Sequence, residues 1–383
     1  MIVLPVGAAS NYYGRNAVVW NALQFAAVAY TGLSNLAYTC LKPIPFINRA
    51  LPQLQPLPPV VTTTTTTTTR KRKVAIVTGS NTGIGFETSR ALVEHGYEVV
   101  MACRSKDKAT QAMERIHANL QEGAQGRAVF HGPLDLSDVS SIQTFSNTLL
   151  DQYDRIDVLV NNAGRNYGGQ TEEGYDEVFF TNYLGHFLLT HNLLEPLLLK
   201  ADSPRVVNLS SVMHHFCHAN RHDETYWTQF AKPNNQNKDE TDYSSYSPSK
   251  LAALLFSIEL NRRYRSRGLR SIAVNPGAVN SDIWRKFPRF IIPLFRLLYL
   301  NNQQGSHTSV AAALSQDLPD DTIYLQPYYQ PQPSSVPFPP LEMLGVFVGH
   351  QPTTPRLPND GTQGALSAQV LWETSEKLLN MPR

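Results

Sequence analysis

From Val74 onward, short and almost wholly apolar runs alternate with longer segments in which apolar residues recur every three or four positions. The second pattern is typical of amphipathic helices, and we expect helices such as Phe86 to His95 and Val139 to Tyr153. Strands that are apolar along their whole length are typical of parallel sheets covered by helices on both faces. The alternation therefore predicts an α/β fold with a doubly wound parallel sheet. The predicted strands are Val74 to Gly79, Glu98 to Cys103, Ala128 to Asp135, Val158 to Gly164, Arg205 to Ser211 and Ser271 to Gly277.

The chain before Val74 follows a different pattern. Residues 16–41 contain no charged residue and, at about 1.5 Å per helical residue, are long enough to cross a bilayer, although several polar residues interrupt them. We expect residues 1–45 to form a hydrophobic anchor that spans the membrane or lies in its surface; a targeting peptide and a helix packed on the domain are the alternatives. Basic residues follow this segment, so the main domain is expected in the cytosol, at the endoplasmic reticulum or another organelle membrane.

Two further segments depart from the strand and helix pattern. Residues 46–72 are rich in proline and include eight consecutive threonines, which cannot supply a packed core and predict a disordered linker. We expect residues 73–383 to form a single domain. Within it, residues 316–360 are a proline-rich insertion, which we interpret as a loop or as an extended protein-binding segment. The polar residues 213–243 are expected to border a substrate cleft.

Composition narrows the class of protein. The chain has 383 residues, of which 42% are hydrophobic and 17% charged, so it can bury a sizeable core. Its formal charge of +2 provides no general attraction for nucleic acid, which we exclude as a partner. The three cysteines, Cys40, Cys103 and Cys217, are scattered and do not indicate a disulfide framework. This usage is typical of a reducing compartment.

A glycine-rich turn joins the first predicted strand to the first predicted helix. Its glycines remove Cβ atoms where the backbone must approach a pyrophosphate, and the helix start offers unpaired N–H groups to the phosphates. In this strand–turn–helix context the motif predicts a dinucleotide site of Rossmann type. The residues expected to contact the cofactor are Gly79, Ser80, Asn81, Thr82, Gly83, Ile84 and Gly85.

The end of the second predicted strand bears on the choice of cofactor. A fold that prefers NAD commonly has an acidic residue here to bind the ribose hydroxyls. This chain has Cys103 and Arg104 instead, and a guanidinium can pair with a ribose 2′-phosphate. We therefore expect NADP(H) rather than NAD(H).

Tyr246 and Lys250 are four residues apart, a spacing that places both side chains on one face of a helix. A neighbouring ammonium favours the phenolate, so a phenol whose pKa is ordinarily about 10 could act as a general acid or base nearer neutral pH. Pro248 lies between them. If Ser244 or Ser245 caps the helix, Pro248 falls in its first turn, where a missing N–H is tolerated.

Together these motifs resemble the short-chain dehydrogenase/reductase superfamily, and within it the retinol dehydrogenase and WW-domain oxidoreductase-like branch. The resemblance covers residues 73–315 and 365–379. It implies that adenosine is bound beyond the third and fourth strands and that a Pro-Gly loop flanks the nicotinamide amide. The residues at the matching positions are Asp135, Leu136, Asn162, Ala163, Gly164, Pro276, Gly277 and Val279.

The resemblance also implies a catalytic set. Tyr246 would exchange the substrate proton. Lys250, aided by the positive nicotinamide, would lower the pKa of Tyr246, and it would also hold the nicotinamide ribose, so both residues belong to the cofactor site as well. Ser211 would donate a hydrogen bond to the substrate oxygen, whereas Ser210 would be a packing neighbour. Asn182 would fix a water that links Lys250 to solvent.

The expected function is NADP(H)-dependent interconversion of an alcohol with its ketone or aldehyde by hydride transfer. Residues 284–300 mix large apolar and basic side chains, and the resemblance implies that this region covers the substrate pocket, which would suit an apolar, lipid-like substrate such as a retinoid or a steroid. An amphipathic helix packed on the core is an equal alternative for this segment. One alternative is a catalytically quiet NADP(H)-binding sensor or scaffold protein. A lesser alternative is a reductase of the protochlorophyllide type, although its expected cysteine after the tyrosine motif is absent here.

Two remaining questions concern metals and assembly. The histidines between His214 and His222 lie close to Cys217, but their spacing matches no closed zinc pattern, and we expect no metal. The sequence leaves the oligomeric state open, with a homodimer as one possibility.

Overall fold

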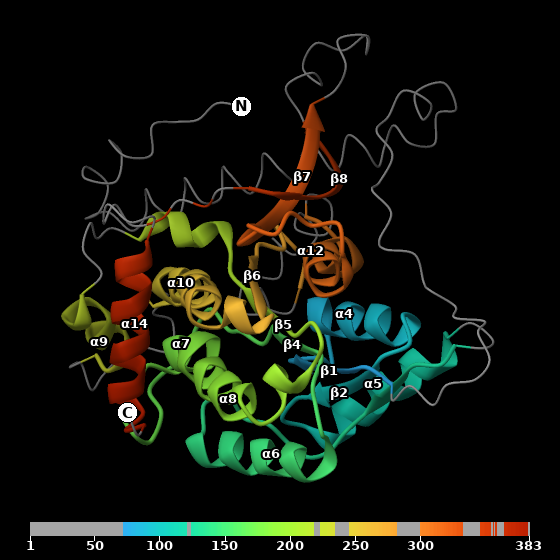
Figure 1. The fold of residues 1–383 in the computed structure, drawn as a ribbon, viewed down its shortest axis with the longest axis horizontal. Coiled ribbons are helices and arrows are strands. Elements are labelled where there is room, and N and C mark those ends of the chain that lie inside the picture. Colours follow the sequence, from blue (N-terminus) through green and yellow to red (C-terminus); the bar gives the residue numbers. More distant parts are fainter. Residues whose placement is uncertain are drawn as a thin grey trace, which may run out of the picture.

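The computed structural model describes residues 72–120, 124–217, 223–233, 245–281, 299–331, 345–353, 355, 357 and 364–381. The expected anchor and nearly all of the linker lie outside these residues. Within the described residues, a single sheet of eight strands has the order β3-β2-β1-β4-β5-β6-β7-β8 (Figure 1). The strands are β1 (Val74–Thr78), β2 (Glu98–Ala102), β3 (Arg127–Val129), β4 (Val158–Asn161), β5 (Arg205–Leu209), β6 (Arg270–Val274), β7 (Tyr324–Pro331) and β8 (Gly345–Pro352).

All six predicted strands are present, and neighbours from β3 to β7 pair in parallel. The sheet order reverses between β1 and β4, so the chain leaves these two adjacent strands in opposite directions. This switch point is where open α/β sheets bind their ligands. The prediction for Ala128 to Asp135 was too long, because β3 ends at Val129 and the following residues leave the sheet.

Helices cover both faces of the sheet, as the apolar strands predicted (Figure 1). Along β1, Ala75 and Val77 belong to one apolar cluster and Ile76 to the other, because successive side chains of a strand point to opposite faces. The first cluster contains residues of α4 (Gly83–Glu94), α5 (Lys106–Ala118) and α12 (Asn302–Leu314). The second contains residues of α6 (Val139–Gln152), α8 (Gly185–Leu194), α9 (Glu224–Ala231), α10 (Tyr246–Tyr264) and α14 (Ala365–Leu378).

The shorter elements connect these helices to the sheet. A helical turn, α7 (Glu177–Phe179), runs through the π-helical turn η1 (Phe180–Leu184) directly into α8. The 3₁₀ turns are η2 (Leu198–Lys200), η3 (Val212–Phe216) and η4 (Arg265–Arg267).

The structure corrects the loop interpretation of residues 316–360. β7 extends the parallel sheet beyond β6, with Tyr324 opposite Ala273, and β8 returns antiparallel to β7. Tyr324 and Leu325 are almost fully buried, and two of the prolines that suggested a loop, Pro327 and Pro331, lie within β7 itself. Residues 332–344, between the two strands, lie outside the described residues.

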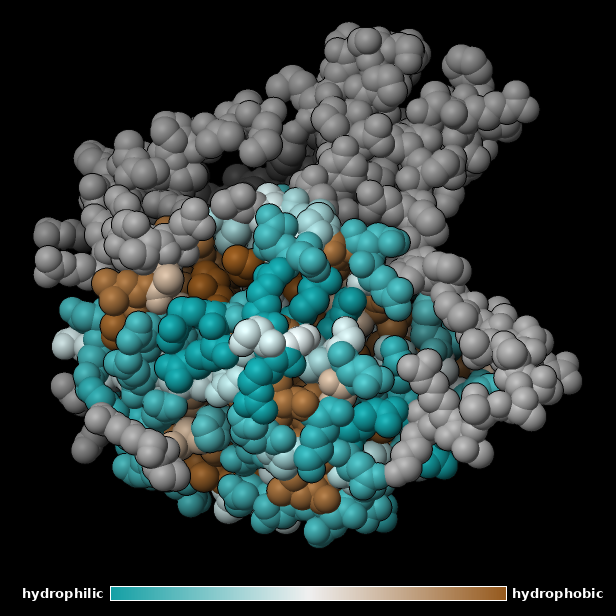
Figure 2. Space-filling view, in the orientation of Figure 1, coloured by the Kyte–Doolittle hydropathy of each residue, from teal (hydrophilic) through white to brown (hydrophobic). Residues whose placement is uncertain are grey.

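On the face shown in Figure 2, hydrophilic residues predominate and hydrophobic residues form separate patches. Among the described residues, no helix is both long enough and apolar enough to cross a membrane.

Candidate active site

The glycine-rich turn leaves the end of β1 and leads into α4 at the switch point of the sheet. Gly79 and Gly83 have φ angles of +64° and +60°, in the left-handed region that favours glycine. At Gly85 a Cβ would lie 2.4 Å from both the Gly79 carbonyl oxygen and the Asn162 side-chain nitrogen. A Cβ at Gly83 would only touch Ser281 and Asn302, at 3.8 and 3.9 Å, so the positive φ and not crowding favours glycine there. This geometry fits a pyrophosphate held at the start of α4.

The residues that follow β4 are hydrogen-bonded to Thr78, the last residue of β1 before this turn. The backbone N–H groups of Asn162 and Ala163 both donate to the Thr78 hydroxyl oxygen at 2.9 Å. The Asn162 side chain donates to the Thr78 carbonyl at 2.7 Å. Gly164 follows, and a Cβ there would lie 3.5 Å from the Lys250 ammonium nitrogen. Asn162 and Ala163 therefore hold the two strand ends together, while Gly164 borders Lys250.

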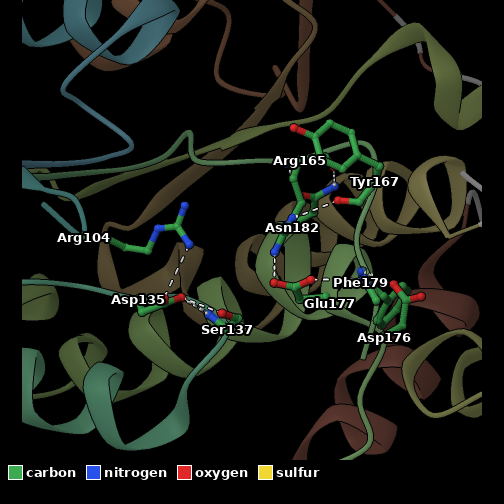
Figure 3. A network of polar contacts seen from close by, with 10 residues as sticks. Arg104, Asp135, Ser137, Arg165, Tyr167, Asp176, Glu177, Phe179 and Asn182 are labelled. Atoms are coloured by element: carbon green, nitrogen blue, oxygen red, sulfur yellow. Dashed lines mark hydrogen bonds and ion pairs between the residues drawn. The ribbon is translucent and has the colours of Figure 1, made fainter. Parts of the chain in front are cut away.

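The expected adenosine end of the site contains an ion pair. Arg104 follows β2, Asp135 follows β3, and their charged groups are 3.6 Å apart (Figure 3). The other oxygen of Asp135 accepts hydrogen bonds from the Ser137 backbone N–H at 2.9 Å and hydroxyl at 2.6 Å. Ser137 thus orients Asp135, while the Arg104 side chain remains 66% exposed. Leu136 is buried, and its carbonyl oxygen packs closely against Gly185 of α8.

Tyr246 is the first residue of α10, and Lys250 lies one turn later with its ammonium nitrogen 5.6 Å from the centre of the Tyr246 ring. Pro248 is the third residue of α10, so it does fall in the first turn. Ser245 occupies the N-cap position but makes no capping hydrogen bond through its side chain. Ser244, the other proposed cap, lies outside the described residues.

Burial is the largest influence on the pKa of both Tyr246 and Lys250. Burial raises the pKa of Tyr246 to about 12, opposed by a hydrogen bond from Ser211. Burial also lowers the pKa of Lys250 to about 8. The Lys250 ammonium donates a hydrogen bond to the Leu209 carbonyl oxygen at 3.0 Å. Burial therefore disfavours the charged form of each group, and a lowering of the Tyr246 pKa by Lys250 together with the nicotinamide stays a prediction.

The two serines at the end of β5 contact different groups. Ser210 is buried and donates a hydrogen bond from its hydroxyl to the Lys250 carbonyl at 2.7 Å. Ser211 is partly exposed, and its hydroxyl contacts Tyr246 and accepts the Met213 backbone N–H at 3.3 Å. Ser210 thus fixes the catalytic helix to the sheet, while Ser211 shares a surface with the phenol.

The side chain of Asn182 acts as a clamp on the loop that follows β4. Its oxygen accepts the Arg165 N–H, and its nitrogen donates to the Arg165 carbonyl, both at 2.8 Å (Figure 3). The same nitrogen donates to Ser249 at 3.0 Å. Arg165 in turn pairs with Glu177 at the start of α7. The backbone carbonyl of Asn182 contacts His186 at 3.2 Å, a residue that we did not single out from the sequence.

The Pro-Gly loop after β6 is a tight turn. Gly277 has a φ angle of +83°, and its N–H donates to the Asn275 side chain at 3.1 Å. The Val279 side chain is 4% exposed and packs against Leu300 and Ile84. Pro276 precedes the turn and is partly buried. The buried side chain of Val279 therefore supports the loop. Residues 282–298, which include most of the expected substrate segment, lie outside the described residues.

Comparison with known proteins decides the family. Residues 73–221 match the short chain dehydrogenase family. Retinol dehydrogenase 11 of Mus musculus is 38% identical over 253 residues, which cover 64% of this chain and 74% of that protein. The chain belongs to the short-chain dehydrogenase/reductase family. It lies in the retinol dehydrogenase-like branch of this family of oxidoreductases, which bind nicotinamide cofactors.

Other members resemble this dehydrogenase/reductase chain over a greater length. The WW domain-containing oxidoreductase of Gallus gallus is 32% identical over 313 residues, 80% of this chain and 68% of that protein. Among solved structures, an uncharacterised protein from Mycobacterium Paratuberculosis is 29% identical and has a TM-score of 0.56, covering 81% of this chain and 94% of that one. The similarity therefore extends beyond the residues of the family match, which end at position 221.

Proposed function

We propose that this protein is an NADP(H)-dependent oxidoreductase that interconverts an alcohol and its ketone or aldehyde on an apolar, lipid-like substrate. The observation that carries the proposal is the contact between Ser211, which follows β5, and Tyr246, the first residue of α10. The Lys250 ammonium lies beside the Tyr246 ring and beside Gly164 after β4, and the glycine-rich turn packs against the same strand end at Ala163. A hydroxyl, a phenol and an ammonium gathered beside a dinucleotide turn suit hydride transfer coupled to proton transfer.

Each group has a distinct task in the proposed reaction. When bound, the nicotinamide supplies or accepts the hydride, while Tyr246 gives the proton to the carbonyl oxygen or takes it from the hydroxyl. Ser211 donates a hydrogen bond to that oxygen as negative charge develops. Lys250 provides a nearby positive charge, yet the pKa of Tyr246 stays near 12, so the phenol keeps its proton at neutral pH. The phenol is thus well suited to donate that proton during carbonyl reduction.

The preference for NADP(H) is supported by Arg104. Its guanidinium is exposed beyond β2, where a ribose 2′-phosphate would lie. The end of β2 also lacks the acidic residue that NAD-preferring folds commonly have there, because Cys103 and Arg104 follow the strand. Asp135, its present partner, is held on its other oxygen by Ser137, so Arg104 can turn toward a phosphate without leaving Asp135 unpaired.

An apolar substrate is supported by two observations. The relatives include retinol dehydrogenases, named for an apolar alcohol. In this chain, Val212 directly follows Ser211 and is 42% exposed, so an apolar side chain borders the proposed reacting groups.

The test is NADPH consumption with a panel of long-chain, retinoid and steroid aldehydes and ketones. We expect turnover that falls by roughly 10²–10⁴-fold in Tyr246→Phe, because proton transfer by a positioned side chain contributes about that much. NADPH binding should persist in the variant. Tyr264→Phe, which removes a phenol hydroxyl from the far end of the same helix, is the matched control and should keep full activity.

Two other results would contradict the proposal. Tight NADPH binding without turnover of any substrate would favour the sensor or scaffold alternative. Full activity in Tyr246→Phe would show that another group transfers the proton.

A further inference from the structure

His186 is a buried polar residue near the start of helix α8, and both of its ring nitrogens have partners. Nε2 lies 2.8 Å from the Thr78 hydroxyl oxygen, at the end of β1. Nδ1 lies 3.2 Å from the backbone carbonyl oxygen of Asn182, one turn earlier. The side chain is 3% exposed and thus joins the glycine-rich turn to the helix that carries Asn182.

The partners determine where the protons lie. A carbonyl oxygen can only accept, so Nδ1 of His186 must carry a proton and donate it to Asn182. The Thr78 hydroxyl oxygen already accepts two N–H groups, from Asn162 and Ala163. Its own proton can go to the Val160 carbonyl oxygen at 3.4 Å or to Nε2 of His186 at 2.8 Å, and the shorter contact assigns it to Nε2. Burial lowers the pKa of His186 to about 3, which keeps the ring neutral with one donor and one acceptor nitrogen.

The contact with Asn182 lies at an irregular point of the helix. Asn182 is in the π-helical turn η1, and such turns in α-helices are frequent at functional sites. The side chain of Asn182 is already hydrogen-bonded to Arg165 and Ser249. Its backbone carbonyl is held separately, by the hydrogen bond from His186. Ser249 then donates to the carbonyl oxygen of Tyr246 at 2.6 Å. A continuous series of hydrogen bonds therefore runs from Thr78 through His186, Asn182 and Ser249 to Tyr246.

We propose that His186 is a positioning residue that couples the cofactor turn to the catalytic helices. Through Nε2 it fixes the Thr78 hydroxyl and with it the ends of β1 and β4. Through Nδ1 it fixes the peptide of Asn182 and, beyond it, the start of α10. The proposal rests on the proposed function, because it assigns His186 a role in cofactor binding and turnover. The competing explanation is that His186 only satisfies buried polar groups and contributes to stability.

Two conservative variants separate the two contacts. The amide of His186→Gln reaches the position of Nε2, so it keeps the Thr78 contact and loses the Asn182 contact. The shorter amide of His186→Asn lies near the position of Nδ1, so it keeps the Asn182 contact and loses the Thr78 contact. His186→Phe removes both and keeps a ring. His191→Gln, on the same helix, is the matched control.

The measurements are the NADPH dissociation constant, from protein fluorescence, and kcat at saturating NADPH and aldehyde. Losing one buried hydrogen bond should change the affected quantity by about tenfold. We expect His186→Asn to raise the dissociation constant with little change in kcat. We expect His186→Gln to lower kcat with little change in the dissociation constant, and His186→Phe to change both. His191→Gln should match the unchanged protein.

Three sets of results bear on whether the positioning role of His186 fails. If the Asn and Gln variants lose thermal stability but keep the dissociation constant and kcat of the unchanged protein, or change both quantities in parallel, His186 is purely structural. If the unchanged protein turns over no substrate, the catalytic side of the proposed function fails, and equal NADPH affinities of the Asn and Gln variants would then overturn the positioning role as well. Should a His186 variant not fold, Thr78→Val should raise the dissociation constant and Thr78→Ser, which keeps the hydroxyl, should restore it.

Discussion

Burial governs the titration of the groups around Tyr246. It raises the pKa of the Tyr246 phenol, lowers that of the Lys250 ammonium and lowers that of the His186 imidazolium, because a low-dielectric surrounding disfavours whichever form is charged. From the sequence we expected the charge of Lys250 to dominate. That expectation considered the charges of Lys250 and of the nicotinamide but not the desolvation that only packing reveals.

The depressed pKa of His186 predicts a specific pH dependence of stability. In the unfolded chain its pKa is near 6.5, and in the folded protein it is about 3, so the unfolded state binds more protons between these values. The free energy of unfolding should therefore fall as the pH drops from about 6.5 toward 3, by at most about 1.4 kcal/mol per pH unit from this group. Urea unfolding at several pH values, compared between the unchanged protein and His186→Gln, should show a smaller decrease in the variant. An identical decrease in both would contradict the assignment.

Arg104 provides the prediction about cofactor choice. Arg104→Ala should raise the dissociation constant of NADPH by roughly 10–100-fold, since a charge-assisted hydrogen bond contributes about 1.5–3 kcal/mol. NADH binding should change little. Isothermal titration with both cofactors measures the two constants, with Arg267→Ala, another exposed arginine, as the control. A parallel loss for both cofactors would show that Arg104 does not contact a 2′-phosphate.

At the scale of elements, local sequence patterns predicted the repeated strands and several helices. The glycine-rich turn and the first-turn position of Pro248 were also predictable, because each depends on backbone preferences within a few residues. β7 was missed, because prolines are unusual in strands and its pairing with β6 depends on residues about fifty positions away. The π-helical turn at Asn182 has no local signature in the chain.

The packing of α14 on α10 should contribute measurably to the free energy of unfolding. Trp372 is 2% exposed, and its ring contacts Phe187, Phe256 and the Arg263 guanidinium. Trp372→Ala should lower the free energy of unfolding by about 3–5 kcal/mol through the lost burial and the cavity left behind. Leu366→Ala on the same helix, where the side chain is 54% exposed, should change it by no more than about 0.5 kcal/mol. Denaturant unfolding measures both, and equal effects would show that α14 does not depend on this contact.

At the scale of the whole molecule, the described domain begins where the first strand begins. The glycine-rich turn, Tyr246 and both apolar clusters lie after residue 73. We propose that the anchor predicted for residues 16–41 acts independently of these elements. Membrane attachment and cofactor binding should be separable.

Deletion of residues 1–69 tests this separation. The full chain should sediment with endoplasmic reticulum membranes, whereas the deleted form should remain in the soluble fraction, because the uncharged segment supplies the apolar surface for attachment. Both forms should bind NADPH equally well. Fractionation followed by a binding assay measures the two properties. Equal solubility of both forms would refute the anchor.

The sequence by itself determined the alternation of strands and helices, the glycine-rich turn and the residue types able to move a proton. These depend on periodicity and on backbone chemistry within short segments. Only the tertiary structure decided which distant residues share contacts. Thr78 and His186 are 108 positions apart. They meet because β1 lies beside β4 and α8 packs on the face of the sheet to which Ile76 and Leu159 point. The same packing set the pKa values of Tyr246 and Lys250, since desolvation depends on everything that surrounds a group and not on its neighbours in sequence.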